Sequence, residues 1–248
     1  MKEITYKERA KFYNQEIQKN EDLLYFLNTL KNHLKIDSTI LIPCGTGIYS
    51  DYFSKVFSLN YFMDSEEAMI EELKLNLSLN KINNIEPLIK NMKDSLNKKV
   101  DAVFVLEQGI QFLNHNEFYT FLKIQSDFCK YIILDMYDFL SNYDDYLSYY
   151  DSKKSANYKE FIFNNKLYKR KITYKKELQG INFFYDYSNK QDSTIYKSNV
   201  YLYNYNLKET INIINSIDNI KINSIYKNYL FDSCSNNNRY ILILEVIK

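Results

Sequence analysis

Two of the chain's four glycines stand close together in the segment Cys44-Gly45-Thr46-Gly47. An apolar stretch at 39–43 precedes this segment, and helical spacing over 48–57 follows it. Because glycine has no Cβ, such a turn lets a ligand approach the backbone, and the free N–H groups that open the helix can face its polar groups. A turn without a ligand would have the same form, but the scarcity of glycine elsewhere in the chain favours binding.

Asp64 is the second residue whose position suggests chemistry. It lies 17 residues beyond the last glycine of this segment, at the end of an apolar strand predicted over 59–63. A carboxylate at such a strand end can accept hydrogen bonds from ribose hydroxyls. It could instead cap the helix predicted over 65–79, with Glu67 completing a capping box, or Ser65 could be the cap. The spacing from the glycine segment favours ribose binding.

Apolar strands and amphipathic helices alternate around these residues. Strands are predicted over 39–43, 59–63, 87–89, 101–106 and 131–135, and helices over 7–34 (interrupted near 20–22), 48–57, 65–79 and 116–128. This alternation predicts βαβ units and a parallel sheet. The alternating residues of 161–205 predict inserted antiparallel strands. The chain then ends with a predicted helix over 207–217 and two strands over 222–230 and 239–247.

The composition excludes several classes of protein. A net charge of +1, with acids and bases interspersed, gives no general attraction to nucleic acid or to a membrane surface. The apolar runs are shorter than the ~20 residues that cross a bilayer, and residues 1–10 lack the apolar core of a secretion signal. Cys44, Cys129 and Cys234 have no metal-ligand spacing, so we predict a cytoplasmic protein without a metal site.

Several segments resemble, in order, the motifs of class I S-adenosylmethionine-dependent methyltransferases, of the small-molecule N- or O-methyltransferase type. Residues 40–47 (Ile-Leu-Ile-Pro-Cys-Gly-Thr-Gly) resemble motif I, and residues 61–70 (Tyr-Phe-Met-Asp-Ser-Glu-Glu-Ala-Met-Ile) resemble the second-strand motif. Segment 90–94 is similar to the loop after the third strand, 101–113 to the fourth strand and its substrate-facing loop, and 10–14 to a helix folded over the active site. The resemblance covers 8–136 motif by motif and 198–248 by topology.

The resemblance implies an α/β fold with a doubly wound, mostly parallel, Rossmann-like sheet of seven strands that closes with an antiparallel strand. We assign 1–136 and 201–248 to this core, with lid helices within 1–36. Residues 137–200 would form an inserted antiparallel β subdomain, which would cover the substrate or pair two subunits in a homodimer.

The cofactor implied by the resemblance is S-adenosyl-L-methionine. Gly45 and Gly47 would line its methionine and ribose parts, and Asp64 would bind the ribose. Asn91 and Met92 would contact the edge of the adenine. The full predicted set is Pro43, Cys44, Gly45, Thr46, Gly47, Asp64, Ser65, Met69, Asn91, Met92, Leu106 and Glu107.

Two positions depart from the family's pattern. Leu41 stands where motif I usually has an acid, and Pro43 stands where it has Gly or Ala. Without the acid, the amino group of the cofactor is short of one partner. The departure implies weaker binding or, as the alternative, loss of activity.

Methyl transfer needs mainly orientation and exclusion of water, and it needs a general base when the acceptor is an oxygen. His115 is the first candidate for that base and Glu107 the second, although a histidine at 115 also suits a helix start. Tyr13 is a further catalytic candidate, because tyrosine faces can hold a cationic sulfonium or amine. The predicted substrate contacts are Tyr6, Tyr13, Gln108 and Tyr137.

We therefore predict an enzyme that transfers a methyl group from S-adenosylmethionine to a nitrogen or oxygen of a small polar metabolite. Amino sugars, amino acids and glycan precursors are the expected acceptors. The glycines and Asp64 alone also fit an NAD-dependent oxidoreductase, because Gly45-x-Gly47-x-x-Ser50 approximates the dinucleotide fingerprint. A third interpretation is a catalytically degenerate methyltransferase-fold subunit that supports an active partner.

Overall fold

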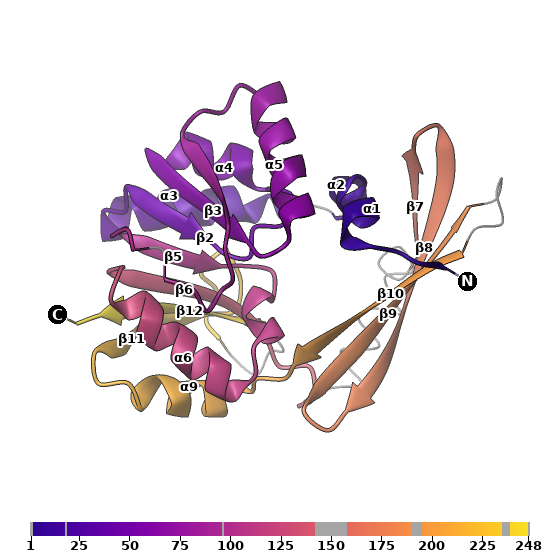
Figure 1. The fold of residues 1–248 in the computed structure, drawn as a ribbon. Coiled ribbons are helices and arrows are strands. Elements are labelled where there is room, and N and C mark those ends of the chain that lie inside the picture. Colours follow the sequence, from indigo (N-terminus) through magenta and orange to yellow (C-terminus); the bar gives the residue numbers. More distant parts are fainter. Residues whose placement is uncertain are drawn as a thin grey trace.

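The computed structural model describes residues 2–17, 19–95, 97–141, 158–189, 195–234 and 239–247. These residues form two β-sheets, one of seven strands and one of five. Helices flank the larger sheet, and two short helices lie between it and the smaller sheet (Figure 1). No helix of the described ranges is both long and apolar enough to cross a membrane.

The larger sheet has the strand order β11-β12-β6-β5-β2-β3-β4. Its strands are β2 (Ser38–Leu41), β3 (Leu59–Asp64), β4 (Ile85–Ile89), β5 (Ala102–Val105), β6 (Tyr131–Tyr137), β11 (Ile220–Tyr226) and β12 (Arg239–Val246). The five strands from β4 to β6 in this order are parallel, whereas β12 runs antiparallel to both of its neighbours. The predicted seven-stranded, mostly parallel sheet with an antiparallel closing strand is confirmed.

Helices cover both faces of this sheet and bury its apolar strands. The helices are α3 (Asp22–Leu34), α4 (Ser50–Val56), α5 (Glu67–Leu79), α6 (His115–Ser126) and α9 (Leu207–Asn215). Apolar residues of α3, α4 and α5 pack together on one face, and those of α6 and α9 pack on the other. All four residues of β5 are buried, as expected for a central parallel strand covered on both faces.

The smaller sheet has the order β1-β10-β9-β8-β7, and its long strands are antiparallel. Its strands are β1 (Lys2–Glu3), β7 (Tyr158–Phe163), β8 (Lys166–Glu177), β9 (Gly180–Asn189) and β10 (Ile195–Tyr203). Strand β10 stays paired with β9 as far as Tyr203. The sheet also includes β1, from the amino-terminal region, as a parallel edge strand beside β10.

The helices of residues 1–36 lie in two different places. Helix α3 is part of the core, since Leu23, Phe26 and Leu27 are fully buried against the larger sheet. Only α1 (Tyr6–Ala10) and α2 (Tyr13–Glu16) lie between the sheets, where α1 contacts α5 and α2 contacts β7.

A buried polar cluster attaches α1 and α2 to the smaller sheet. The carboxylate of Glu16 accepts hydrogen bonds from Arg9 Nε at 3.0 Å and from the Tyr187 hydroxyl at 2.7 Å. Arg170 donates to the backbone carbonyl of Glu16 at 3.1 Å. Since the Glu16 side chain has no exposed surface, these partners offset the cost of burying its charge. The two helices and the sheet are therefore joined by charge as well as by apolar packing.

A second buried ion pair joins β6 to β12 beneath the carboxyl ends of the parallel strands. Arg239 donates from Nε and a terminal nitrogen to the two carboxylate oxygens of Asp135, both at 2.9 Å. The Tyr229 hydroxyl donates to the same carboxylate at 2.8 Å. The Asp135 side chain is fully buried, so it depends on these donors.

We expect Arg239→Met to lower the free energy of unfolding by about 3 kcal/mol, because it leaves the Asp135 charge buried without its cationic partner. The control is Lys221→Met, since Lys221 pairs with Glu245 on the protein surface and such pairs contribute less than about 1 kcal/mol. Urea unfolding of both variants measures the difference. Equal losses would show that Asp135 does not depend on Arg239.

Candidate functional site

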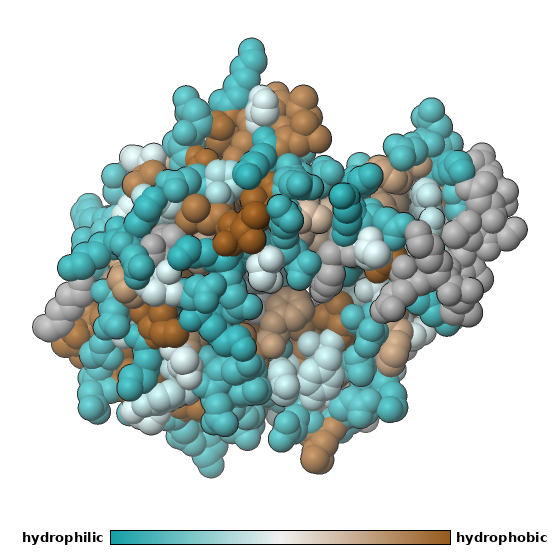
Figure 2. All heavy atoms as spheres, viewed as in Figure 1, coloured by the Kyte–Doolittle hydropathy of each residue, from teal (hydrophilic) through white to brown (hydrophobic). Residues whose placement is uncertain are grey.

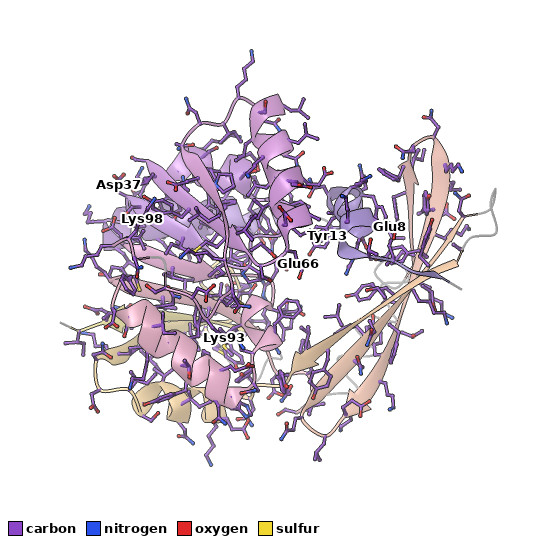
Figure 3. The ribbon with its side chains drawn as sticks, viewed as in Figure 1. Glu8, Tyr13, Asp37, Glu66, Lys93 and Lys98 are labelled. Atoms are coloured by element: carbon purple, nitrogen blue, oxygen red, sulfur yellow. The ribbon has the colours of Figure 1, made fainter. Side chains whose placement is uncertain are left out.

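A cleft of about 570 Å³ opens at the carboxyl ends of β2, β3 and β5. In an open α/β sheet, this is the edge at which ligands bind. The smaller sheet closes the cleft through Tyr185, Val200 and Leu202, and α2 closes it through Tyr13. The space-filling view shows a notch between the parts built on the two sheets (Figure 2). Figure 3 places Tyr13 and Glu66 around this space.

The glycine turn forms one wall of the cleft and is tied to Asp64. Gly45 and Gly47 both have positive φ, at 53° and 74°. The Gly45 N–H donates to Asp64 Oδ2 at 2.8 Å, and the Glu66 N–H donates to Oδ1 at 3.0 Å. Burial raises the pKa of Asp64, while these N–H donors favour its charged form. The carboxylate also lines the cleft, where it can accept from a ligand hydroxyl.

Thr46 and Gly47 support the turn from behind and do not line the cleft. The Thr46 hydroxyl donates to the Asn14 side chain, which ties the turn to α2. A Cβ on Gly47 would lie 2.3 Å from Leu73 Cδ1 of α5, so the turn packs directly on that helix. Thr46 and Gly47, predicted as cofactor contacts, thus lie next to the cleft and hold its wall.

The predicted adenine contacts gather along the β3 and β4 ends of the cleft. Ser65, Met69, Asn91 and Met92 all line it. The Asn91 side-chain oxygen accepts from the Lys93 N–H at 3.0 Å, so its amide nitrogen points elsewhere. Leu41, Pro43 and Cys44 line the cleft at the end of β2.

The loop after β5 brings Glu107 and Gln108 into the cleft with an unusual backbone. Both residues have positive φ, at 49° and 66°, which is uncommon without glycine. The Glu107 N–H donates to Asp135 Oδ2 at 3.1 Å, which fixes the loop on the buried ion pair. Glu107 Oε1 accepts from the Tyr49 hydroxyl at 2.8 Å. Gly109 begins the 3₁₀ turn that follows (Gly109–Phe112). It packs closely on Pro43, because a Cβ at Gly109 would lie 2.4 Å from the Pro43 Cδ.

Glu107 is a carboxylate whose surroundings oppose its charge. Solvent reaches it from the cleft, but protein atoms surround it, and this desolvation is the largest cause of its raised pKa. The Asp135 carboxylate raises the pKa further, while Arg239 and the Tyr49 hydroxyl partly offset the rise.

Two of the predicted catalytic and substrate residues, His115 and Tyr137, are not brought to the cleft. His115 begins α6, is exposed, and packs its ring edge-on against Tyr205 with centroids 4.7 Å apart. Tyr137 ends β6 and stacks with Phe139 at 5.9 Å, beside the smaller sheet's apolar cluster. Tyr6 begins α1, and its side chain lies outside the described part of the chain. Tyr13, Leu106, Glu107 and Gln108 do line the cleft.

Several residues of the site carried no usable sequence signal. Tyr49 and Tyr229 are two of 25 tyrosines, so nothing in the sequence distinguishes them. Asp135 and Arg239 did carry a signal, because each is a charge at the end of an otherwise apolar strand. Such charges need buried partners, and the antiparallel pairing of β6 and β12 brings the two together.

We expect Gly47→Ala to destabilise the protein more than Gly45→Ala. Both positions have positive φ, but only the Gly47 methyl group would overlap Leu73, whereas the Gly45 methyl group would stand 3.4 Å from Tyr13 Cε1. Thermal unfolding of the two variants measures the difference in Tm. An equal Tm for both would mean that the turn does not pack on α5 as described.

We expect Glu107→Gln to raise Tm at pH 7 when no ligand is present. The raised pKa means that folding opposes the ionised form, and glutamine removes that cost. The gain should shrink as pH falls through the pKa of Glu107, because the wild-type side chain is then neutral too. Glu71→Gln, at an exposed position of α5, is the control and should change Tm little. A gain that grows on acidification would contradict the assignment.

Comparison with known proteins supports the fold but gives no sequence family. No protein-family model matches the chain, and no curated protein sequence matches it. Solved structures do match over nearly the whole chain. One is an S-adenosylmethionine-dependent methyltransferase from Clostridium acetobutylicum ATCC 824, with TM-score 0.74 and 11% identity over 97% of this chain and 96% of that one.

Two further matches are with enzymes of sugar methylation. The sugar N-methyltransferase KedS8 from Streptoalloteichus sp ATCC 53650 has TM-score 0.76 and 10% identity, over 96% of this chain and 92% of that one. CalS10, an amino pentose methyltransferase from Micromonospora echinaspora, solved with S-adenosylmethionine bound, has TM-score 0.68 and 11% identity, over 98% and 92%. The chain thus has the fold of the class I S-adenosylmethionine-dependent methyltransferases.

Proposed function

We propose that this protein is an S-adenosylmethionine-dependent methyltransferase that acts on a nitrogen or oxygen of a small polar metabolite. The observation that carries the proposal is the composition of the cleft. The glycine turn, Asp64 and the Asn91-Met92 loop line it together, at the strand ends where this fold binds its ligand. The methyltransferase resemblance assigns these residues to one ligand. They follow or end three different strands, β2, β3 and β4, and they line the same cleft.

The walls of the cleft fit the cofactor. Tyr13 stands over Gly45, where a Cβ on the glycine would lie 3.4 Å from its ring. Asp64 is held by backbone N–H groups, those of Gly45 and Glu66 among them, and it lines the cleft. Asp64 would hold the ribose, and Met69, Asn91 and Met92 would surround the adenine. When bound, the cofactor supplies an electrophilic methyl group on a sulfonium.

The rest of the cleft would receive the acceptor, between the β5 loop and the smaller sheet. Gln108 and Tyr13 reach this part from the larger sheet and the lid, and Tyr185 reaches it from β9. No histidine lines the cleft among the described residues, and His115 lies outside it. Of the two candidate bases only Glu107 lines the cleft, so a hydroxyl acceptor would need Glu107, whereas a neutral amine would need no base before transfer.

The protein's own contribution would be to orient two molecules and exclude water. The Arg9–Glu16–Tyr187 cluster holds α2 and the smaller sheet as one unit over the cleft. That unit would bring Tyr13 and Tyr185, whose rings pack against the Arg9 guanidinium, to the bound pair and help to orient it. Pairing of two copies through the smaller sheet stays a prediction.

We expect isothermal titration calorimetry to detect binding of S-adenosylmethionine and of its demethylated product, S-adenosylhomocysteine. Asp64→Ala should weaken both by about 100-fold, because two ribose hydroxyls lose a charged acceptor. Asp218→Ala, at an exposed residue of the turn after α9, is the control and should bind like the wild type. Tm of each variant is measured alongside, since Asp64 also holds the glycine turn.

Other outcomes would favour the other interpretations. Binding of neither ligand, together with thermal stabilisation by NAD alone, would replace the proposal with an oxidoreductase. Binding without any product from a panel of amino sugars and amino acids, together with tight association with a related subunit, would favour a degenerate partner.

A further inference from the structure

The glycine segment lacks one of the charges that a zwitterionic ligand needs. S-adenosylmethionine carries an α-ammonium and a carboxylate on its methionyl part. The motif that this segment resembles usually supplies an acid near the ammonium, but this chain has Leu41 there. Leu41 borders the cleft, but its apolar side chain is buried in the core beneath α3 and α4 and cannot accept a hydrogen bond. If the proposed function holds, an ammonium beside it would need a partner from elsewhere.

The neighbouring strand brings a carboxylate to the same cleft. Leu41 of β2 pairs with Phe104 of β5, and Glu107 follows Phe104 by three residues. Because β2 and β5 are adjacent and parallel, their carboxyl ends meet at the same edge of the sheet. Leu41 and Glu107 both line the cleft there.

The Glu107 carboxylate is held on the glycine-turn side of the cleft. Its Oε1 accepts from the Tyr49 hydroxyl, and Tyr49 follows Gly47 by two residues at the start of α4. The Tyr49 hydroxyl also accepts from the Asn20 N–H at 3.3 Å, so it is fixed from the α3 side as well. The acceptor part of the cleft is lined instead by the smaller sheet, through Tyr185 and Leu202.

The Glu107 carboxylate is available to bind a cation. The nearby Asp135 is paired by both of its oxygens with Arg239, so this pair carries no net charge. The side chain of Glu107 has one hydrogen-bond partner among the described residues, Tyr49, and its second oxygen accepts from none of them. The surroundings of Glu107 disfavour its negative charge, and its backbone has positive φ. Both features are common at functional sites.

We propose that Glu107 binds the α-ammonium group of the cofactor's methionyl part and replaces the acid that is missing at Leu41. Tyr49 acts as a positioning residue, because it holds the carboxylate and touches no ligand in this assignment. The proposal rests on the proposed function. It assigns Glu107 to cofactor binding and not to the removal of a proton from the acceptor.

Two ligands that differ in the amino-acid part test the proposal. S-adenosylhomocysteine carries the α-ammonium, and 5′-methylthioadenosine has the same adenosine and sulfur without the amino acid. We expect Glu107→Gln to lower the affinity for S-adenosylhomocysteine by about 10- to 100-fold and to leave that for methylthioadenosine unchanged. Glu71→Gln is the matched control and should bind both ligands as the wild type does.

Tyr49→Phe keeps the carboxylate and removes its support, so it provides a second variant. It should lower the affinity for S-adenosylhomocysteine by less than Glu107→Gln does, again with no change for methylthioadenosine. Unchanged binding of S-adenosylhomocysteine to Glu107→Gln, or equal losses for both ligands, would overturn the assignment of Glu107. If the wild type bound neither ligand, the proposed function itself would fall, and the two failures are thus distinguishable.

Discussion

The hydrogen bond from the Gly45 N–H to Asp64 is the interaction on which the cleft depends. It joins the ends of β2 and β3, and it holds the glycine turn where the following helix begins. The turn can take this course because Gly45 and Gly47 adopt positive φ and because Gly47 leaves space for Leu73. A Cβ at Gly47 would overlap the Leu73 side chain, which would have to shift.

A second constraint is the set of charges beneath the β5 loop. Asp135, Arg239 and Tyr229 form a saturated buried array, and the Glu107 backbone is anchored to it. Desolvation, with a smaller effect of the nearby Asp135 charge, makes the ionised Glu107 side chain unfavourable, so the loop has stability to gain from a neutral residue there. Glu107 is a destabilising carboxylate that faces the cleft. Its presence is explained if a bound cation offsets the cost of its negative charge.

The sequence predicted the fold well because the signals for it are local. Apolar runs such as that of β5 mark buried strands, and the helices between them have regular spacing. Partners far apart in the chain were not predictable. The Glu16–Tyr187 hydrogen bond joins residues with no shared pattern, and β1 is two residues long. His115 was expected at the site from its place after the β5 loop, but it opens α6 and turns to Tyr205.

The most direct test of the account is a crystal structure of the complex with S-adenosylhomocysteine. We expect the ribose hydroxyls against the Asp64 carboxylate, the adenine between Met69 and the Asn91-Met92 loop, and the α-ammonium at Glu107. A ligand that lies outside the cleft of the larger sheet would contradict the proposed cofactor site. A ligand in the cleft whose ammonium faces away from Glu107 would contradict the role given to that residue.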